Sequence, residues 1–328
     1  MRILVTGGSG RLGNVLVRKL LAMGHDVHVM VEPGDTSPES LADVDVKLHA
    51  GSVLDKPSLS SAMKHTEVVY HLAAKVLLEP DKDGSMWAVN VTGTRYVADL
   101  CLDHGVSRLV HCSVPYALER EPMDQVMDET RPLALNEKTD YFRSKAHSER
   151  YILDYINQGL DSVILSPVAL IGPYDFGPSI MGQFLLEIYS GRMNTVVEGK
   201  GSFVDVRDAV EGIVAAAEIG KTGERYFLAG HMLDTNALEL LYTEFRKRNA
   251  LKRTLCSGTM SPMLQIIKSS KKVRGRELSF NKEIIRATQA PFAISNQKAI
   301  SELGFRIRDI KSSFLDTLGW YEKMNWLS

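Results

Sequence analysis

The sequence has few cysteines, no long apolar run and almost no net charge. Its three cysteines, Cys101, Cys112 and Cys256, show neither the spacing of a metal site nor a paired framework, which excludes a disulfide-dense secreted fold and indicates a reducing compartment. No apolar run approaches the roughly 18 residues that cross a bilayer. The first apolar run, residues 3–5, stops at once at Thr6-Gly7-Gly8, unlike a signal peptide. We therefore expect a cytoplasmic protein without a signal peptide, a transmembrane segment or a metal site.

The charge balance narrows the choice of partner. A formal net charge of −1 over 328 residues gives no reason to expect nucleic acid as a ligand. One segment departs from this balance, because residues 246–276 hold ten lysines or arginines and no acid. We interpret this basic stretch as a solvated face, and the alternative is a surface for an anionic partner or for membrane headgroups.

Short β-branched runs alternate with amphipathic helical patterns along the first half of the chain. Apolar strands separated by such helices predict an α/β fold with a parallel sheet covered on both faces. The expected strands are 2–6, 27–31, 46–49, 68–71, 107–112 and 161–166. The expected helices are 11–24, 56–64, 84–104, 139–158 and 207–220. Asp55 is expected to cap the second helix, which has a proline in its first turn.

A glycine-rich segment joins the first expected strand to the first expected helix. It reads Thr6-Gly7-Gly8-Ser9-Gly10-Arg11-Leu12-Gly13 and satisfies both G-x-G-x-x-G and T-G-x-x-G-x-x-G. In such loops one glycine permits the tight turn, one lets the backbone approach a pyrophosphate, and one lets helix and strand pack closely. The free N–H groups and positive dipole end of the helix then hold the phosphates. We therefore expect a doubly wound, Rossmann-type sheet that binds a dinucleotide.

The regular alternation of strand and helix patterns ends after Pro167. Irregular glycine and proline punctuation in residues 172–200 and 230–300 predicts a smaller, mixed lobe. We expect an NAD(P)-binding Rossmann domain over residues 1–170 and a mainly substrate-binding lobe over residues 171–328. Within that lobe, a segment at about residues 200–230 is expected to return to the Rossmann sheet.

The residue that follows the second expected strand bears on the choice of cofactor. Glu32 lies about 20 residues beyond Gly13, where an acid usually accepts hydrogen bonds from the adenosine ribose and repels a 2′-phosphate. This position favours NAD. Arg11, inside the glycine loop, could instead pair with a phosphate, and Glu32 could be a solvated loop acid, so NADP stays open.

Tyr141 and Lys145 lie near the start of a long expected helix. A spacing of four residues places the phenol and the ammonium on one face of that helix. A nearby cation favours the phenolate, so we expect Lys145 to lower the pKa of Tyr141 from about 10 toward neutrality. Such a phenol can pass a proton to or from a substrate oxygen while a nicotinamide passes a hydride.

With these motifs, the sequence resembles the extended short-chain dehydrogenase/reductases, also called the NAD-dependent epimerase/dehydratase family. The resemblance covers nearly the whole chain. It is strongest for the dihydroflavonol-reductase-like branch, which includes hopanoid-associated sugar epimerases. Besides the glycine loop and the Tyr/Lys pair, the matching segments are His71–Ala74, Asn90–Thr94, Pro167–Pro173, Phe203–Asp208, Gly223–Leu228 and Lys298–Phe305.

The resemblance implies roles for individual residues. Tyr141 would be the acid/base, Lys145 would hold the nicotinamide ribose and tune Tyr141, and Ser113 is a weaker catalytic candidate. Asn90 would support the active-site backbone, although an asparagine at a helix start is often only a cap. Residues 72–74 would lie along the cofactor, and residues 167–168 would lie beside the nicotinamide. The full set of implied cofactor contacts is Gly7, Gly8, Ser9, Gly10, Arg11, Leu12, Gly13, Glu32, Ser52, Val53, Leu72, Ala73, Ala74, Asn90, Tyr141, Lys145, Pro167 and Val168.

Three positions depart from the pattern of that family. Its members usually carry two hydroxyl residues after the fifth strand, and the second hydrogen-bonds the reacting oxygen. Here the second is Val114, which cannot donate, and losing one such donor typically costs about 2.7–4 kcal/mol. Ser113 or Tyr116 could substitute after a local shift, or Ser113 could only satisfy backbone groups. Ser52 replaces an acid that often contacts adenine, and Glu32 stands where the reductase branch often has an arginine for NADP.

Two functions are compatible with these residues. The first is an NAD(P)-dependent oxidoreductase or epimerase that transfers hydride at a carbinol or ketone, such as a nucleotide-sugar or an isoprenoid-type molecule, with Tyr141 as acid/base. The second is a non-catalytic or weakly active NAD(P)-binding protein, because of Val114. The resemblance also implies a homodimer, in which helices 84–104 and 139–158 pair with their symmetry mates as a four-helix bundle.

Overall fold

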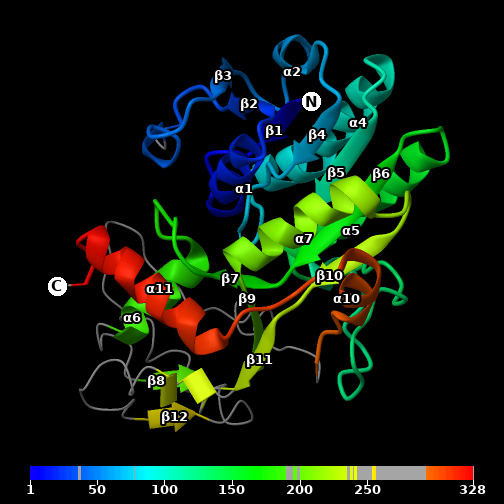
Figure 1. The fold of residues 1–328 in the computed structure, drawn as a ribbon. Coiled ribbons are helices and arrows are strands. Elements are labelled where there is room, and N and C mark those ends of the chain that lie inside the picture. The colour runs from blue at the N-terminus through cyan, green and yellow to red at the C-terminus, as the bar shows by residue number, and fades with distance from the viewer. Residues whose placement is uncertain are drawn as a thin grey trace.

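A sheet of seven parallel strands forms the centre of the molecule (Figure 1), with the strand order β10-β6-β5-β4-β1-β2-β3. The computed structural model describes residues 1–35, 38–77, 79–189, 195–197, 200–234, 237–238, 240–241, 253–255 and 293–327. The strands are β1 (Arg2–Thr6), β2 (Asp26–Val31), β3 (Lys47–Ala50), β4 (Val68–His71), β5 (Arg108–Cys112), β6 (Ser162–Pro167) and β10 (Arg225–Leu228). The six expected strands and the doubly wound α/β fold are thus confirmed.

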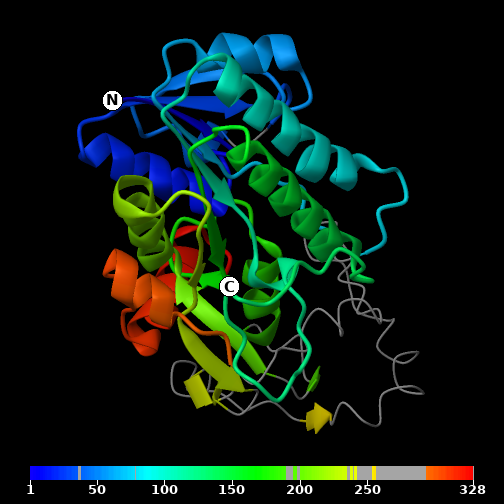
Figure 2. The ribbon, with the colours of Figure 1, turned by 90° about the vertical axis from the view of Figure 1, so that its right-hand side faces the viewer.

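Helices cover both faces of this sheet, as the view in Figure 2 shows. On one face lie α1 (Arg11–Ala22) and α7 (Val206–Ile219), and on the other lie α2 (Lys56–Met63), α4 (Thr94–Asp103) and α5 (Asp140–Ile156). Successive side chains of β1 point to opposite faces of the sheet. Ile3 and Val5 therefore pack in the core under α1 and α7, and Leu4 packs in the core under α4 and α5. A strand buried on both faces needs the continuous apolar run that the sequence has there.

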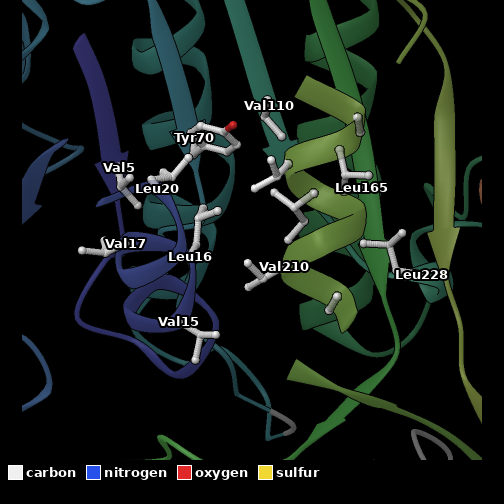
Figure 3. Packing of buried hydrophobic residues seen from close by; sticks show 14 of the residues in the cluster. Val5, Val15, Leu16, Val17, Leu20, Tyr70, Val110, Leu165, Val210 and Leu228 are labelled. Carbon is white, nitrogen blue, oxygen red and sulfur yellow. The ribbon is translucent and has the colours of Figure 1, made fainter. Parts of the chain in front are cut away.

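The core under α1 and α7 joins parts of the chain that are far apart in sequence. Figure 3 shows Leu16 and Leu20 of α1 near Tyr70 of the sheet in the left half of the view, and Val210 of α7 near Leu165 of the sheet in the right half. All five are at most 3% exposed. Full burial of one such aliphatic side chain contributes about 1.5–3 kcal/mol, so this packing holds α7 firmly on the sheet.

The single helix expected over residues 84–104 is wrong in one respect. The segment consists of α3 (Ser85–Trp87), a π-helical segment η2 (Ala88–Gly93) and then α4. Thr94 Oγ1 donates a hydrogen bond to the carbonyl oxygen of Asn90 at 2.7 Å. This bond lies at the point where the π-helical segment passes into α4. The expected cap at Asp55 is confirmed, since its carboxylate accepts from Ser58 N.

The second half of the chain adds smaller sheets beside the large one. β7 (Ala169–Ile171) and β11 (His231–Asp234) flank β9 (Lys200–Asp205) in a three-stranded sheet, and β8 (Thr195–Val197) pairs with β12 (Arg253–Leu255). The remaining elements are the 3-10 turns η1 (Pro38–Ser40) and η3 (Pro115–Ala117) and the helices α6 (Ile180–Tyr189), α10 (Gln297–Leu303) and α11 (Ile310–Lys323).

Apart from β12, the basic stretch 246–276 lies outside the described residues. Within the described ranges no helix is long and apolar enough to cross a bilayer.

Arg108, the first residue of β5, joins the large sheet to the end of α7. Its guanidinium donates to the carbonyl oxygens of Ala216, Ala217 and Gly220 at 3.2, 3.1 and 2.8 Å, and it pairs with Asp161 at 3.0 Å. The last carbonyls of a helix have no partner within the helix, and a cation there also favours the helix dipole. Arg108 therefore caps a helix that is distant in sequence.

Replacing Arg108 with alanine should lower the free energy of unfolding by about 2 kcal/mol, because helix carbonyls and Asp161 lose a charged donor. Urea denaturation followed by circular dichroism measures this change. Arg150→Ala is the matched control, since Arg150 pairs with Asp154 on the exposed face of α5 and such pairs contribute less than about 0.5 kcal/mol. Equal losses in the two variants would contradict the capping role.

Candidate active site

The glycine loop is enclosed by backbone on two sides. Gly7 has a positive φ of 72°, and a Cβ on it would lie 2.6 Å from the backbone nitrogen of Ala73. A Cβ on Gly13 would overlap the Gly7 carbonyl oxygen and lie 2.7 Å from Gly8 Cα. Because no side chain fits at either position, β1, α1 and the segment after β4 meet at backbone distance. The structure thus brings two predicted sets of cofactor contacts, the loop and residues 72–73, side by side.

The N-terminus of α1 is open to a ligand at this loop. The residue before the helix is Gly10, which has no side chain to cap the first turn. The first turn of α1 also contains no acidic residue. The first N–H groups of a helix are orphan donors at the positive end of its dipole. This end of α1 therefore fits a pyrophosphate.

Two carboxylates lie near the end of β2. Glu32 Oε1 accepts a hydrogen bond from Ser52 Oγ at 2.7 Å, so these two predicted contacts are adjacent. Asp35 Oδ2 accepts from Ser9 Oγ of the glycine loop at 2.6 Å. Sequence reasoning missed Asp35, although the Pro33-Gly34 turn before it was a signal that the chain folds back toward the loop. Val53 is buried beneath the same edge.

Arg11 turns away from the loop that contains it. Its guanidinium pairs with Asp175 at 3.2 Å and donates to Ser179 Oγ at 3.1 Å and to the Gly172 carbonyl at 3.0 Å. The Arg11 side chain is 7% exposed and that of Asp175 is 2% exposed, so the pair is shielded from solvent. Arg11 therefore holds the glycine loop to the segment that leads into α6, a role that sequence spacing could not reveal.

Tyr141 and Lys145 lie on the buried face of α5. Tyr141 packs with Met86 and Phe142, and Lys145 Nζ donates to the carbonyl oxygen of Cys112 at 2.6 Å. Burial raises the pKa of Tyr141 above its ordinary value and lowers the pKa of Lys145. The expected depression of the Tyr141 pKa is therefore wrong for this structure. Desolvation of the phenolate dominates, and the Lys145 ammonium is bonded to a backbone carbonyl instead.

The residues after β5 lie beside Tyr141. Val114 and Tyr116 pack against the apolar cluster that contains Tyr141, and the Tyr116 ring meets Phe142 edge to face at 5.2 Å. Ser113 N donates to the Leu165 carbonyl at 2.7 Å, whereas its buried hydroxyl finds no partner among the described residues. Val114, an aliphatic residue, thus lies in the cluster beside Tyr141, at the position where the resemblance implies a hydroxyl residue.

Asn90 connects the segment after β4 to α5. Its Oδ1 accepts from Lys75 N at 2.8 Å, and its Nδ2 donates to the Lys75 carbonyl at 3.0 Å and to Ser144 Oγ at 2.9 Å. Asn90 lies inside η2 and not at a helix start, so the capping alternative is wrong. The side chain instead fixes the backbone that follows residues 72–74.

The buried ring of His71 connects β1 to α4. Its two ring nitrogens lie 2.8 Å from Thr6 Oγ1 and 2.9 Å from Thr94 Oγ1. Complete burial lowers the pKa of His71 to about 3, so the imidazole is neutral at physiological pH.

Pro167 ends β6 and, with Val168, lies at the same carboxyl edge of the sheet. The described residues contain no group of three or more His, Cys, Asp or Glu side chains that could hold a metal ion.

Comparisons with known proteins agree on one family. The model of the NAD dependent epimerase/dehydratase family matches residues 3–229. Sterol demethylase protein B of Methylococcus capsulatus is 31% identical over 98% of this chain and 99% of that protein. A putative dihydroflavonol 4-reductase of Synechocystis is 26% identical over 98% and 95% of the two chains. The crystal structure of gox2253 has a TM-score of 0.87 at 27% identity and covers 99% of both chains.

These relatives cover 98–99% of the chain and confirm the resemblance found in the motifs. They also confirm the expectation of a nicotinamide-dependent enzyme, because the matched family is described by its use of NAD. The glycine loop, the Asn90 connection and the buried Tyr141 and Lys145 all lie within the matched residues. The chain belongs to the NAD-dependent epimerase/dehydratase family.

Proposed function

We propose that this protein is a nicotinamide-dependent oxidoreductase or epimerase that acts on a carbinol or ketone, with Tyr141 as its acid/base. The observation that supports this most is the buried placement of Tyr141 and Lys145 on α5, which Asn90 ties to the backbone beside the glycine loop. The helix that carries the phenol and the segment that follows β4 are thereby joined through Asn90. This arrangement suits coupled proton and hydride transfer.

The residues present fit a dinucleotide. The glycine loop leaves backbone without Cβ atoms, and the N-terminus of α1 offers free N–H groups for the phosphates. Glu32 and Ser52 would receive the adenosine, and Lys145 would receive the nicotinamide ribose. When bound, the nicotinamide supplies or accepts the hydride. The acid at residue 32 favours NAD as the cofactor.

Tyr141 would handle the proton at the substrate oxygen. Because burial raises the pKa of Tyr141, its phenol keeps the proton at neutral pH and is ready to donate it to a carbonyl oxygen that gains charge. In the reverse direction, a cation that approaches the phenol favours the phenolate, and Lys145 lies one helical turn away. Release of Lys145 from the Cys112 carbonyl would provide that cation.

The surroundings of Tyr141 favour an apolar substrate. Leu77, Val114 and Tyr116 pack against the cluster that contains Tyr141, and an apolar wall stabilises an apolar ligand more than a sugar. The relative from Methylococcus is named for a sterol, which is in line with a cyclic or isoprenoid-type alcohol or ketone. A nucleotide-sugar is the second candidate, and it is supported by the epimerases in the family's description.

The alternative of a protein that binds the cofactor without turnover depends on Val114. This side chain offers no hydrogen bond to a developing oxyanion, while the unpartnered hydroxyl of Ser113 lies one residue away. We favour the enzyme because the connection from Asn90 to α5 preserves the placement of Tyr141. Substitutions at residues 141 and 114 separate the two functions.

Replacing Tyr141 with phenylalanine should lower the rate of ketone reduction about 10²–10⁴-fold, which is the usual contribution of a positioned acid. The rate is measured as oxidation of NADH with a panel of cyclic and isoprenoid ketones. Tyr151→Phe is the matched control, because it removes the same hydroxyl from the same helix, and it should keep full turnover. The affinity for NADH should be unchanged in both variants. Full turnover in Tyr141→Phe would remove the proposed acid/base role.

Introducing serine at residue 114 should raise the same rate by up to about 10²–10³-fold, since it restores one donor to the reacting oxygen. Val114→Ala is the control, because it creates similar space without a donor, and it should give no gain. A protein that binds NADH but shows no turnover with residue 114 as valine or serine would instead support the non-catalytic alternative.

We also propose a homodimer that pairs α4 and α5 with their symmetry mates. Apolar or aromatic side chains are only half-buried in the single chain on both helices, namely Tyr96 and Leu102 of α4 and Tyr151, Leu153 and Tyr155 of α5. Light scattering at micromolar concentration should give twice the mass of one chain. Tyr151→Asp should shift the protein toward monomer, and Ile219→Asp, on an exposed position of α7, should not. A monomeric protein before any substitution would overturn the proposal.

A further inference from the structure

The turn after β2 carries a second carboxylate that faces the glycine loop. Asp35 N donates to the Glu32 carbonyl at 2.9 Å, which closes a turn through Gly34 with its φ of 87°. The turn directs the Asp35 carboxylate back to Ser9, whose hydroxyl donates to it at 2.6 Å. Ser9 is held in turn, since Ser40 Oγ donates to its carbonyl at 2.9 Å. The carboxylate is therefore fixed over the loop.

We propose that Asp35 is a specificity-determining residue that, together with Glu32, excludes NADP from this site. The proposal rests on the dinucleotide binding proposed above. In Rossmann-type sites the adenosine ribose lies between the glycine loop and the end of the second strand, and Asp35 is bonded to the first while Glu32 follows the second. A ribose hydroxyl can donate to either carboxylate, whereas a 2′-phosphate brings negative charge against both.

Two cations of α1 that could offset a 2′-phosphate, Arg11 and Arg18, are already paired. Arg11 is bound to Asp175, Ser179 and Gly172. Arg18, further along α1, pairs with Asp43 at 2.6 Å and donates to the Ser40 carbonyl at 2.9 Å. A phosphate would have to break these contacts to recruit either guanidinium, and loss of Arg11 would leave the buried Asp175 carboxylate without its partner.

The local sequence has the same bias. Between residues 32 and 46 there are five acids and no lysine or arginine. NADP sites commonly use an arginine near this position to accommodate the 2′-phosphate, and this segment offers none. The arrangement therefore selects NAD both by attraction of ribose hydroxyls to fixed acceptors and by repulsion of a charged group.

The test compares the dissociation constants of NADH and NADPH by isothermal titration calorimetry on the full chain. The unmodified protein should bind NADH at least about 10²-fold more tightly than NADPH, because each nearby carboxylate contributes about tenfold. Asp35→Asn keeps an acceptor for Ser9 but removes the charge. It should tighten NADPH about tenfold and leave NADH within about threefold, and adding Glu32→Gln should tighten NADPH further. Higher salt should weaken the discrimination.

Asp45→Asn is the matched control, because Asp45 is an exposed acid of the same segment and its loss gives the same change in net charge. An unchanged NADPH constant in Asp35→Asn, or an equal gain in Asp45→Asn, would overturn the role of Asp35. Equal affinities for NADH and NADPH in the unmodified protein would overturn the selectivity while the proposed function stands. Failure to bind either dinucleotide would instead overturn the proposed function.

Discussion

The crowding where β1 ends is the constraint on which most of the molecule depends. Gly7 and Gly13 have no room for a side chain, because neighbouring backbone occupies the space where each Cβ would stand. This lets the central strand, the first helix and the segment after β4 converge at backbone distance. β1 lies between β4 and β2 in the sheet and pairs with both. The position of β1 therefore bears on the strands on each side of it.

From this junction, hydrogen bonds between buried polar groups extend to α4 and α5. His71 joins Thr6 of β1 to Thr94 of α4, and Asn90 joins Lys75 to Ser144 of α5. Leaving one such group without its partner costs about 1–3 kcal/mol, so each connection has a defined geometry. The π-helical turn at η2 belongs to this system, because it carries Asn90. The side chains of these two connections lie on β1, β4, η2, α4 and α5, the helix that carries Tyr141.

Short-range patterns predicted the fold well, and long-range contacts account for what they missed. The strands and the glycine loop follow from apolar runs and glycine spacing, which are local properties. The pairing of Arg11 with Asp175 joins residues far apart in the sequence, and no periodicity marks it. The π-helical turn at residues 88–93 carries no periodicity that distinguishes it from an α-helix in the sequence. The pKa of Tyr141 was predicted from Lys145 alone, whereas burial by distant segments determines its direction.

The way in which the second half of the chain returns to the sheet limits how such a protein can be recombined. α7 covers the face that α1 shares, Arg108 holds its end, and β10 extends the sheet beyond β6. A chimera that exchanged everything after residue 170 with a relative would replace α7 and β10 of the large sheet together with the smaller sheets. The natural units of exchange are the segments on either side of α7 and β10. Changes of substrate by recombination therefore require two separate insertions into a retained scaffold, not one terminal replacement.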